Sequence, residues 1–134
     1  MTTAFLGALA AFLGHLLIAL ALVGIFAAAH MRSTPHDELL HIRSGNMAAT
    51  IGFVGALIGY AIVLSRAITV SHGIGETLVW GLIALIVQVG GHFVLSKVLP
   101  QLYSSLAEGQ MSAGLMQGGL AISLGLLNAA SMTP

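Results

Sequence analysis

Histidine is the commonest side chain with metal-binding chemistry in this chain, and three of the six histidines fall within residues 30–41. His36 and His41 are five residues apart, and Asp37 lies one helical turn before His41. Imidazole nitrogens bind Zn, Cu or Ni, and a carboxylate can complete such a site. The segment lacks the four nitrogen or sulfur ligands of a closed structural zinc site. His36, Asp37 and His41 are therefore weak metal candidates; we expect a solvated polar loop and predict no metal or cofactor.

Six polar side chains lie inside long apolar stretches, where burial of an unpaired polar group costs several kcal/mol. They are His15, Tyr60, Gln88, His92, Gln117 and Asn128. Helical rise places His15 level with Tyr60, and it places His92 level with Gln117 at roughly 10 Å from the ends of their stretches. We predict that these buried groups form hydrogen bonds between helices. A polar pathway or a ligand pocket is the alternative interpretation.

Two of these histidines raise the question of a bound prosthetic group. A bis-histidine haem needs both ligands at one depth, whereas His15 and His92 differ by roughly 10 Å along their helices. A single histidine can ligate a chlorophyll, and the small residue Ala11 lies one turn before His15. This spacing is common in an alanine-rich helix. A cofactor-binding subunit of an electron-transfer or light-harvesting complex is therefore kept only as an alternative.

The composition indicates an integral membrane protein. Of the 134 residues 57% are apolar and only 6% are charged, whereas a soluble domain carries about 25% charged residues. The net charge is zero and no basic cluster is present, which excludes electrostatic binding of nucleic acid. The chain has no cysteine, and no nucleophile, base and orienting acid share one depth, so we do not expect an enzyme.

Four stretches are long enough to cross a bilayer as helices, which takes about 20 apolar residues. They cover residues 4–29, 46–65, 77–96 and 111–131. A backbone in lipid must satisfy its own hydrogen bonds, and the period-two alternation of a membrane barrel is absent, so we predict an all-α fold. Thr34 as an N-cap, followed by Pro35, predicts a short interfacial helix over residues 35–44. Pro100 begins a similar segment before the fourth span.

The few basic residues predict an orientation in the membrane. Four spans put both termini on one side of the bilayer. The first and third loops carry Arg32, Arg43 and Lys97, whereas the opposite side carries only Arg66. Cytoplasmic loops are enriched in Lys and Arg. We therefore expect loops one and three in the cytoplasm and the termini outside.

The second half of the chain repeats the first at an offset of 64 residues. The segment GNMAATIGFVGALIGYAIVLSRAI, which begins at Gly45, aligns with GQMSAGLMQGGLAISLGLLNAASM, which begins at Gly109. A proline and an amphipathic stretch precede both segments. A unit of two spans restores the same side of the membrane, so the repeats would be parallel. We predict one integrated domain with a first two-helix repeat over residues 1–72 and a second over residues 73–134.

The two motifs SGNMAATIGFVGALIGYAIVLS and EGQMSAGLMQGGLAISLGLLNAAS resemble the YjfL-like family of small bacterial inner-membrane proteins. The resemblance covers essentially the whole chain. It implies four spans, a bacterial source and the inner membrane. It implies no catalytic residues, because the family is a domain of unknown function. Gln110 departs from the pattern of the first repeat, which has Asn46 at that place.

Small residues recur at helical spacing along the second span. Gly52, Gly55 and Gly59 form this stripe, and Gly119 with Ser123 is its counterpart in the fourth span. In lipid, helices associate through close packing, and glycine lets two backbones approach. The stripe predicts packing among the four helices of the chain and also packing between copies.

Two classes of function are consistent with these features. We predict a membrane protein that acts by helix–helix assembly with lipid around it, as a homo-oligomer or as an accessory subunit of a larger membrane complex. The alternative is a neutral channel or transporter lined by Gln88, Gln117 and Asn128. No span has an acidic or basic residue in its interior, and such residues usually mark ion and proton routes.

Overall fold

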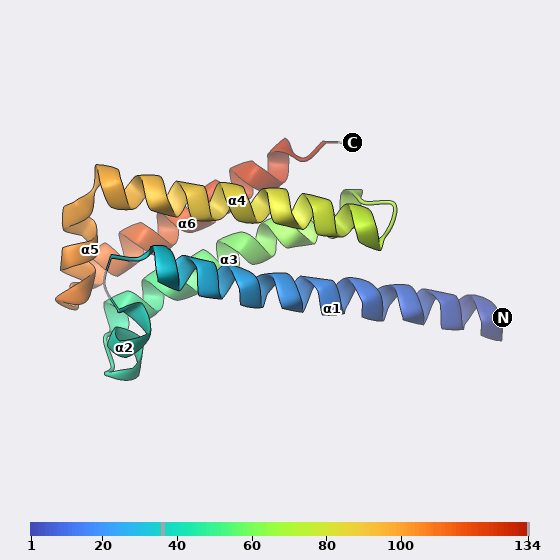
Figure 1. Cartoon of the computed structure of the whole chain (residues 1–134), viewed down its shortest axis with the longest axis horizontal. Coiled ribbons are helices and arrows are strands. Elements are labelled where there is room, and N and C mark those ends of the chain that lie inside the picture. The colour runs from blue at the N-terminus through green and yellow to red at the C-terminus, as the bar shows by residue number, and fades with distance from the viewer. Residues whose placement is uncertain (36, 134) are drawn as a thin grey trace.

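The computed structural model describes residues 1–35 and 37–133, which form a helical bundle (Figure 1). Its helices are α1 (Thr2–Ser33), α2 (Glu38–Arg43), α3 (Met47–Val70), α4 (Ile74–Val98), α5 (Pro100–Ala107) and α6 (Met111–Ser131). Neither of the two described ranges contains a strand. The all-α prediction is therefore confirmed.

Four of these helices are long and apolar enough to cross a membrane. α1, α3, α4 and α6 have 32, 24, 25 and 21 residues, against the about 20 that a hydrocarbon core requires. Each helix covers one of the four predicted apolar stretches, except that Asn46, the first residue of the second stretch, is the N-cap of α3. The chain is therefore a multi-pass membrane protein with four transmembrane helices.

The short helices α2 and α5 precede α3 and α6. α5 begins with Pro100 in its first turn, as predicted. α2 begins later than predicted because Asp37, and not Thr34, is its N-cap: the Asp37 carboxylate accepts a hydrogen bond from the Leu40 amide at 3.1 Å. Thr34 instead ends α1 with extended backbone angles. The Thr34 side chain therefore does not cap α2, and it is buried in the protein.

The turns that lead into α3 and α6 have the same backbone geometry 64 residues apart. Gly45 and Gly109 adopt φ angles of 87° and 81°, a region in which only glycine avoids a steric penalty. The next residues, Asn46 and Gln110, each donate a backbone hydrogen bond to the carbonyl five residues earlier, at 2.9 and 3.0 Å. This recurrence favours the two-repeat interpretation, which stays a prediction.

The side chains of Asn46 and Gln110 behave differently within these similar turns. Asn46 accepts a hydrogen bond from the Ala49 amide at 3.1 Å and donates to the Leu106 carbonyl at 2.8 Å. It therefore caps α3 and also joins α3 to α5. Gln110 makes no such cap; its amide donates to Glu108 at 3.4 Å on the exposed surface.

The four long helices pack as two side-by-side pairs. α3 lies along α6, and α1 lies along α4 (Figure 1). α3 and α6 both run away from the end of the bundle that holds α2 and α5, which we call the loop end, whereas α1 and α4 run toward it. The first long helices of the two predicted repeats, α1 and α4, are therefore neighbours, and so are the second long helices, α3 and α6.

Glycines of α3 make its contact with α6 close. Gly52, Gly55 and Gly59 face α6 so closely that a Cβ atom added at any of them would collide with it. At Gly55 the collision would involve the backbone of Gly118. The stripe predicted from the sequence therefore packs within the chain.

The predicted counterpart of this stripe does not pack within the chain. Gly119 and Ser123 are exposed: a Cβ atom at Gly119 would meet nothing within 4 Å, and the Ser123 hydroxyl bonds to the Gly119 carbonyl of its own helix. Gly114, Gly118 and Gly125 contact α3 instead. The 64-residue alignment places Gly119 and Ser123 opposite the glycines of the α3 stripe. In the structure a different face of α6 contacts α3.

The most buried part of the bundle lies where α1, α3 and α4 meet. Tyr60 is fully buried and stacks on Phe26, with ring centroids 4.6 Å apart. The Tyr60 hydroxyl donates a hydrogen bond to the Gly81 carbonyl at 2.8 Å, which joins α3 to α4. This core lies directly beside the cavity described below.

The N-terminal half of α1 projects beyond the rest of the bundle (Figure 1). Its large apolar side chains are open to the surroundings; Phe5, Phe12 and Leu17 are 66%, 59% and 65% exposed. A helix of 32 residues is about 48 Å long at 1.5 Å per residue. It is therefore longer than the hydrocarbon core of about 30 Å.

Candidate functional site

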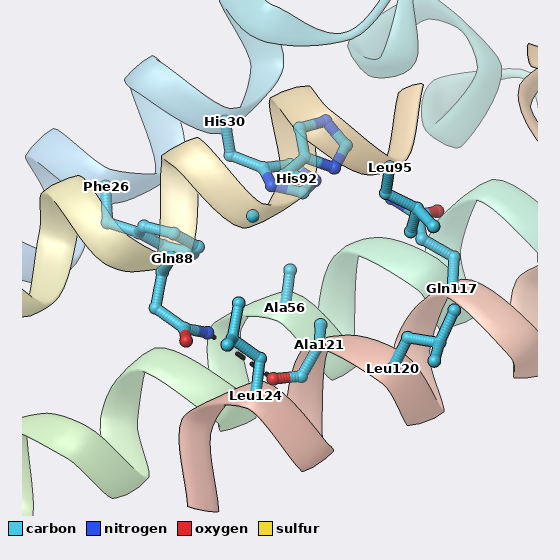
Figure 2. Close-up of a pocket in the computed structure, with 11 residues that line it drawn as sticks. Phe26, His30, Ala56, Gln88, His92, Leu95, Gln117, Leu120, Ala121 and Leu124 are labelled. Atoms are coloured by element: carbon cyan, nitrogen blue, oxygen red, sulfur yellow. Dashed lines mark hydrogen bonds between the residues drawn. The ribbon is translucent and has the colours of Figure 1, made fainter. Parts of the chain in front are cut away.

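A cavity of about 180 Å³ lies among α1, α3, α4 and α6, and we call it the inner cavity (Figure 2). Its polar lining residues are His30, Gln88, His92 and Gln117. Apolar side chains make up the remainder of the wall, with Phe26 from α1 and Leu124 from α6 among them. The lining contains no acidic or basic residue except the two histidines.

Several polar atoms of these residues are buried without a partner. Both ring nitrogens of His30, the Gln88 oxygen and both amide atoms of Gln117 make no hydrogen bond within the described residues. The other amide atom of Gln88 donates to the Ala121 carbonyl at 3.4 Å (Figure 2). An unsatisfied buried donor or acceptor costs about 1–3 kcal/mol. Such a cluster at one cavity points to a site for an additional hydrogen-bonding molecule.

Two imidazole rings meet at the end of the inner cavity nearer the loop end. The ring centroids of His30 and His92 are 3.9 Å apart, and the planes are inclined by 32° (Figure 2). Phe26 and Phe53 flank His30 at 5.6 and 5.8 Å between centroids. His30 is therefore surrounded by three tilted aromatic rings.

A group of five buried side chains, which we call the buried network, continues from these rings to the loop end. It consists of His30, Thr34, Glu38, His92 and Tyr103, all of them buried. The Tyr103 hydroxyl lies 2.9 Å from His92 Nδ1, and the Thr34 hydroxyl lies 3.3 Å from His92 Nε2. Thr34 Oγ1 is 3.1 Å from Glu38 Oε2, and His30 Nε2 is 3.6 Å from the same oxygen.

The fold brings these residues together from separate elements. His30 and Thr34 lie at the end of α1, Glu38 begins α2, His92 is in α4 and Tyr103 is in α5. The break after α1 lets α2 turn back, so that the Glu38 side chain reaches the bundle although α2 is otherwise largely exposed. Glu38 is only 3% exposed, which is unusual for a carboxylate.

Tyr103 keeps its proton in this environment. Burial raises the pKa of the Tyr103 hydroxyl well above its usual value, and the negative charge of nearby Glu38 raises it further. The hydroxyl is therefore a hydrogen-bond donor at neutral pH. The acceptor that lies within reach is the Nδ1 atom of His92.

An open groove of about 480 Å³ lies outside α5 at the loop end, and we call it the α5 groove. Tyr103 lines this groove, together with Lys97 and Ser104. His30 and His92 line the inner cavity. The buried network therefore lies between two hollows of the protein.

The first predicted pairing of polar residues is wrong. His15 is partly exposed, and its ring bonds to the Ala11 carbonyl of its own helix at 2.7 Å. Tyr60 bonds to α4 instead. The two residues share a depth, but equal depth does not fix the direction in which each helix face points.

The second predicted pairing is also wrong, although its members lie at one cavity. His92 bonds to Thr34 and Tyr103, whereas Gln117 makes no hydrogen bond within the described residues. Asn128 does form a bond between helices, because its amide donates to the Ala84 carbonyl of α4 at 3.4 Å. Gln88 and Gln117 line the inner cavity, but Asn128 does not.

Sequence reasoning missed four members of the buried network: His30, Thr34, Glu38 and Tyr103. The spacing of four between His30, Thr34 and Glu38 was a usable signal. We expected a solvated loop here, because burial of Glu38 depends on the path of the chain after Thr34. Nothing in the local sequence shows that this path turns inward.

The structure offers no support for a metal site in the residues that it describes. No group of three histidine or acidic side chains there is arranged to hold a metal ion. Asp37 caps α2, and His36 lies outside the described residues. Both ring nitrogens of His92 lie beside hydroxyl groups, at 2.9 Å from Tyr103 and 3.3 Å from Thr34.

Comparison with known proteins identifies the family. The model of the family described as Domain of Unknown Function (DUF350) matches residues 4–132. The chain is 35% identical over 128 residues to the UPF0719 inner membrane protein YjfL of Escherichia coli strain K12, with 96% of this chain and 97% of the relative covered. The protein of the same name from Escherichia coli O157:H7 matches equally. No solved structure matches significantly.

The predicted resemblance is confirmed, because the family match and the curated relatives both cover almost the whole chain. They also agree with the four apolar helices of the structure. The chain belongs to the DUF350 family, the family of the YjfL-like inner membrane proteins.

Proposed function

We propose that this protein is a non-enzymatic protein of the bacterial inner membrane that binds a small neutral polar molecule in the inner cavity. One observation supports this proposal: the five unpartnered polar atoms of His30, Gln88 and Gln117 are buried at a single cavity. A bound molecule with donors and acceptors would satisfy them. Its binding free energy would offset the cost of keeping these atoms out of water.

The chemistry of the wall favours a neutral guest. Amide and imidazole groups both donate and accept hydrogen bonds. Lys, Arg, Asp and Glu are absent from the lining, so a charged solute would lack a counter-ion. The cavity volume admits several water molecules or one small solute. Urea, acetamide and glycerol are suitable probe molecules, because each is small, neutral and rich in hydrogen-bonding groups.

Replacement of Gln117 tests the proposal through stability. Gln117→Leu keeps the approximate size of the side chain and removes two unpartnered polar atoms. We expect the purified variant to be more stable than the wild type by about 1–3 kcal/mol, and its unfolding temperature to stop responding to probe molecules that stabilise the wild type. Gln101→Leu is the matched control, since Gln101 is exposed on α5.

Transport measurements complement this test. We expect proteoliposomes with wild-type protein to take up at least one probe faster than protein-free liposomes or liposomes with Gln88→Leu. If no probe binds or permeates, and if Gln117→Leu is less stable than the wild type, then Gln117 has a structural role and the proposal is wrong.

A second candidate is self-assembly, supported by the projecting half of α1. Its apolar side chains are exposed around the helix, and α1 is longer than the bilayer core requires. Such a mismatch is relieved by tilting or by association. We propose that the occupant of this surface is a second copy of the chain, which would make the protein a homo-oligomer. An accessory role in a larger complex is the other outcome of the same experiment.

Native mass spectrometry in mild detergent tests this second candidate. We expect a dimer or a larger oligomer for the wild type, and a monomer after Phe5 and Phe12 are both changed to alanine. The double change of Leu126 and Leu127 to alanine is the control, since both are exposed on α6. A monomeric wild type would rule out the homo-oligomer, and a co-purified membrane protein would indicate an accessory subunit.

We also propose an orientation of the protein in the membrane. The basic residues favour a cytoplasmic loop end, with both termini outside. A reporter that is active only in the cytoplasm should then be inactive when fused after Thr133. An active reporter there would reverse the orientation.

A further inference from the structure

The buried network contains a carboxylate that no lysine or arginine among the described residues pairs with. Glu38 lies near His30 at 3.6 Å and near the Thr34 hydroxyl at 3.1 Å. Arg32 and Lys97 are exposed, and the Lys97 ammonium lies over the Phe93 ring. A buried carboxylate without a paired cation is costly unless a proton neutralises it. The neighbour able to share such a proton is the ring of His30.

The hydrogen bonds of the network have a consistent direction. Tyr103 donates from its hydroxyl to His92 Nδ1, which leaves the proton of the neutral ring on Nε2. Nε2–H of His92 then donates to Thr34 Oγ1, and the Thr34 hydroxyl donates to Glu38 Oε2. Each donor in this chain has an acceptor within 3.3 Å. The chain runs from Tyr103, which lines the α5 groove, to Glu38.

Thr34 has two acceptors for one hydroxyl proton. Its oxygen lies 2.9 Å from the His30 carbonyl and 3.1 Å from Glu38 Oε2. It can donate to Glu38 when that carboxylate is charged, and to the His30 carbonyl when Glu38 is protonated. The hydroxyl therefore keeps a partner in both protonation states of Glu38.

We propose that His30 and Glu38 form a proton-binding site that is loaded from the α5 groove through Tyr103, His92 and Thr34. This function goes beyond the binding of a neutral molecule, and it depends on other residues than Gln88 and Gln117. We place proton entry at the groove because Tyr103 is the member of the buried network that lines it. The bound proton rests on Glu38, 3.6 Å from His30, whose side chain lines the inner cavity.

Transfer along the chain balances at every atom. A proton from solvent bonds to the Tyr103 oxygen, and the original Tyr103 proton moves to His92 Nδ1. His92 releases its Nε2 proton to Thr34 Oγ1, and Thr34 releases its own hydroxyl proton to Glu38 Oε2. Including the O–H bond of the hydronium ion that delivers the proton, four bonds to hydrogen form and four break, so the chain gains one proton and Glu38 becomes neutral. No oxidant, reductant or other reactant is needed.

Few other titratable groups among the described residues face this site from the helices around it. α1 contributes His30, α2 contributes Glu38 and the partly exposed His41, α4 contributes His92 and α5 contributes Tyr103. α6 has no titratable residue. Those of α3 bond elsewhere: Tyr60 donates to the Gly81 carbonyl and Arg66 to the Met132 carbonyl. Proton uptake by the site should therefore be separable from other titrations of the protein.

Time-resolved infrared spectroscopy of the intact protein tests the proposal. After a jump from about pH 8 to about pH 5, the range in which histidine changes charge, we expect the carbonyl band of a protonated carboxyl in a buried environment. The uptake should be about one proton per chain, because coupled groups share it. Glu38→Gln should remove this band. Tyr103→Phe should keep its final amplitude and slow its appearance about tenfold or more.

Controls separate the relay from a structural role. His72→Gln changes an exposed histidine at the opposite end of the bundle and should alter neither the amplitude nor the rate. If Glu38→Gln does not fold, isotope-labelled glutamate in the wild type identifies the band, since Glu76 and Glu108 are exposed. A wild type without the band overturns the proton site. An unchanged rate in Tyr103→Phe overturns the relay.

Discussion

The hydroxyl oxygen of Tyr103 lies 2.9 Å from the Nδ1 atom of His92, and this bond joins α5 to α4. The two rings meet edge to face, with centroids 5.3 Å apart. His92 has 8% and Tyr103 has 1% of its surface exposed, so this hydrogen bond is buried. The position of α5 against the bundle therefore depends on this contact.

Changes at His92 should show this dependence. We expect His92→Leu to lower the free energy of unfolding by about 1–3 kcal/mol, because the Tyr103 and Thr34 hydroxyls lose a buried partner. His92→Gln should cost less, since it retains a donor and an acceptor. Unfolding of both variants in detergent measures the difference. Equal stability of both variants and the wild type would contradict the role assigned to this contact.

Alanine at two glycines of the membrane helices should have opposite effects. Gly55→Ala places a methyl group against the Gly118 backbone, which cannot move aside, so α3 and α6 must separate. We expect a loss of stability of about 1–3 kcal/mol, as for overpacked cores. Gly119→Ala meets open space and should be neutral or stabilising by up to about 1 kcal/mol through helix propensity. Unfolding temperatures of the two variants test this contrast.

The two similar turns should respond differently to the loss of their polar side chain. Asn46→Ala removes the cap of α3 and the bond to α5, and we expect it to cost about 0.5–2 kcal/mol. Gln110→Ala should cost less than about 0.5 kcal/mol, because its exposed side chain makes no cap. Equal costs would show that Asn46 contributes nothing specific to the loop end.

Removal of the Tyr60 hydroxyl should weaken the contact between α3 and α4. Tyr60→Phe keeps the stack on Phe26 and loses the hydrogen bond to the Gly81 carbonyl. Such bonds in membrane proteins contribute about 0.6 kcal/mol on average and at most about 1.7. We expect a loss in that range by reversible unfolding. A stabilised variant would contradict the importance of this bond.

The sequence was sufficient to predict the helices but not their faces. Apolar length alone located the four spans, and Pro100 located the start of α5. Depth along a helix is also readable from residue number. Rotation about the helix axis is not, because spans that are apolar on every side have no polar face to orient them. That is why Gly119 proved exposed and why Gln117 does not pair with His92.

The candidate site was predictable only in part for a related reason. His92, Gln88 and Gln117 stood out as polar residues in apolar surroundings, and the inner cavity brings them together. Glu38 and Thr34 stood in a segment with ordinary loop composition. Their burial follows from the reversal of the chain between α1 and α2. Such a reversal depends on contacts with α4 and α5, which are distant in the sequence.

The pairing of α3 with α6 sets an order of assembly during synthesis. α6 emerges from the ribosome after the other five helices, so α3 enters the membrane before its closest neighbour exists. Until α6 arrives, the glycines of α3 face lipid or the insertion machinery, where their small size provides no contact. The first three spans therefore form an unfinished bundle, and insertion of the last helix completes it.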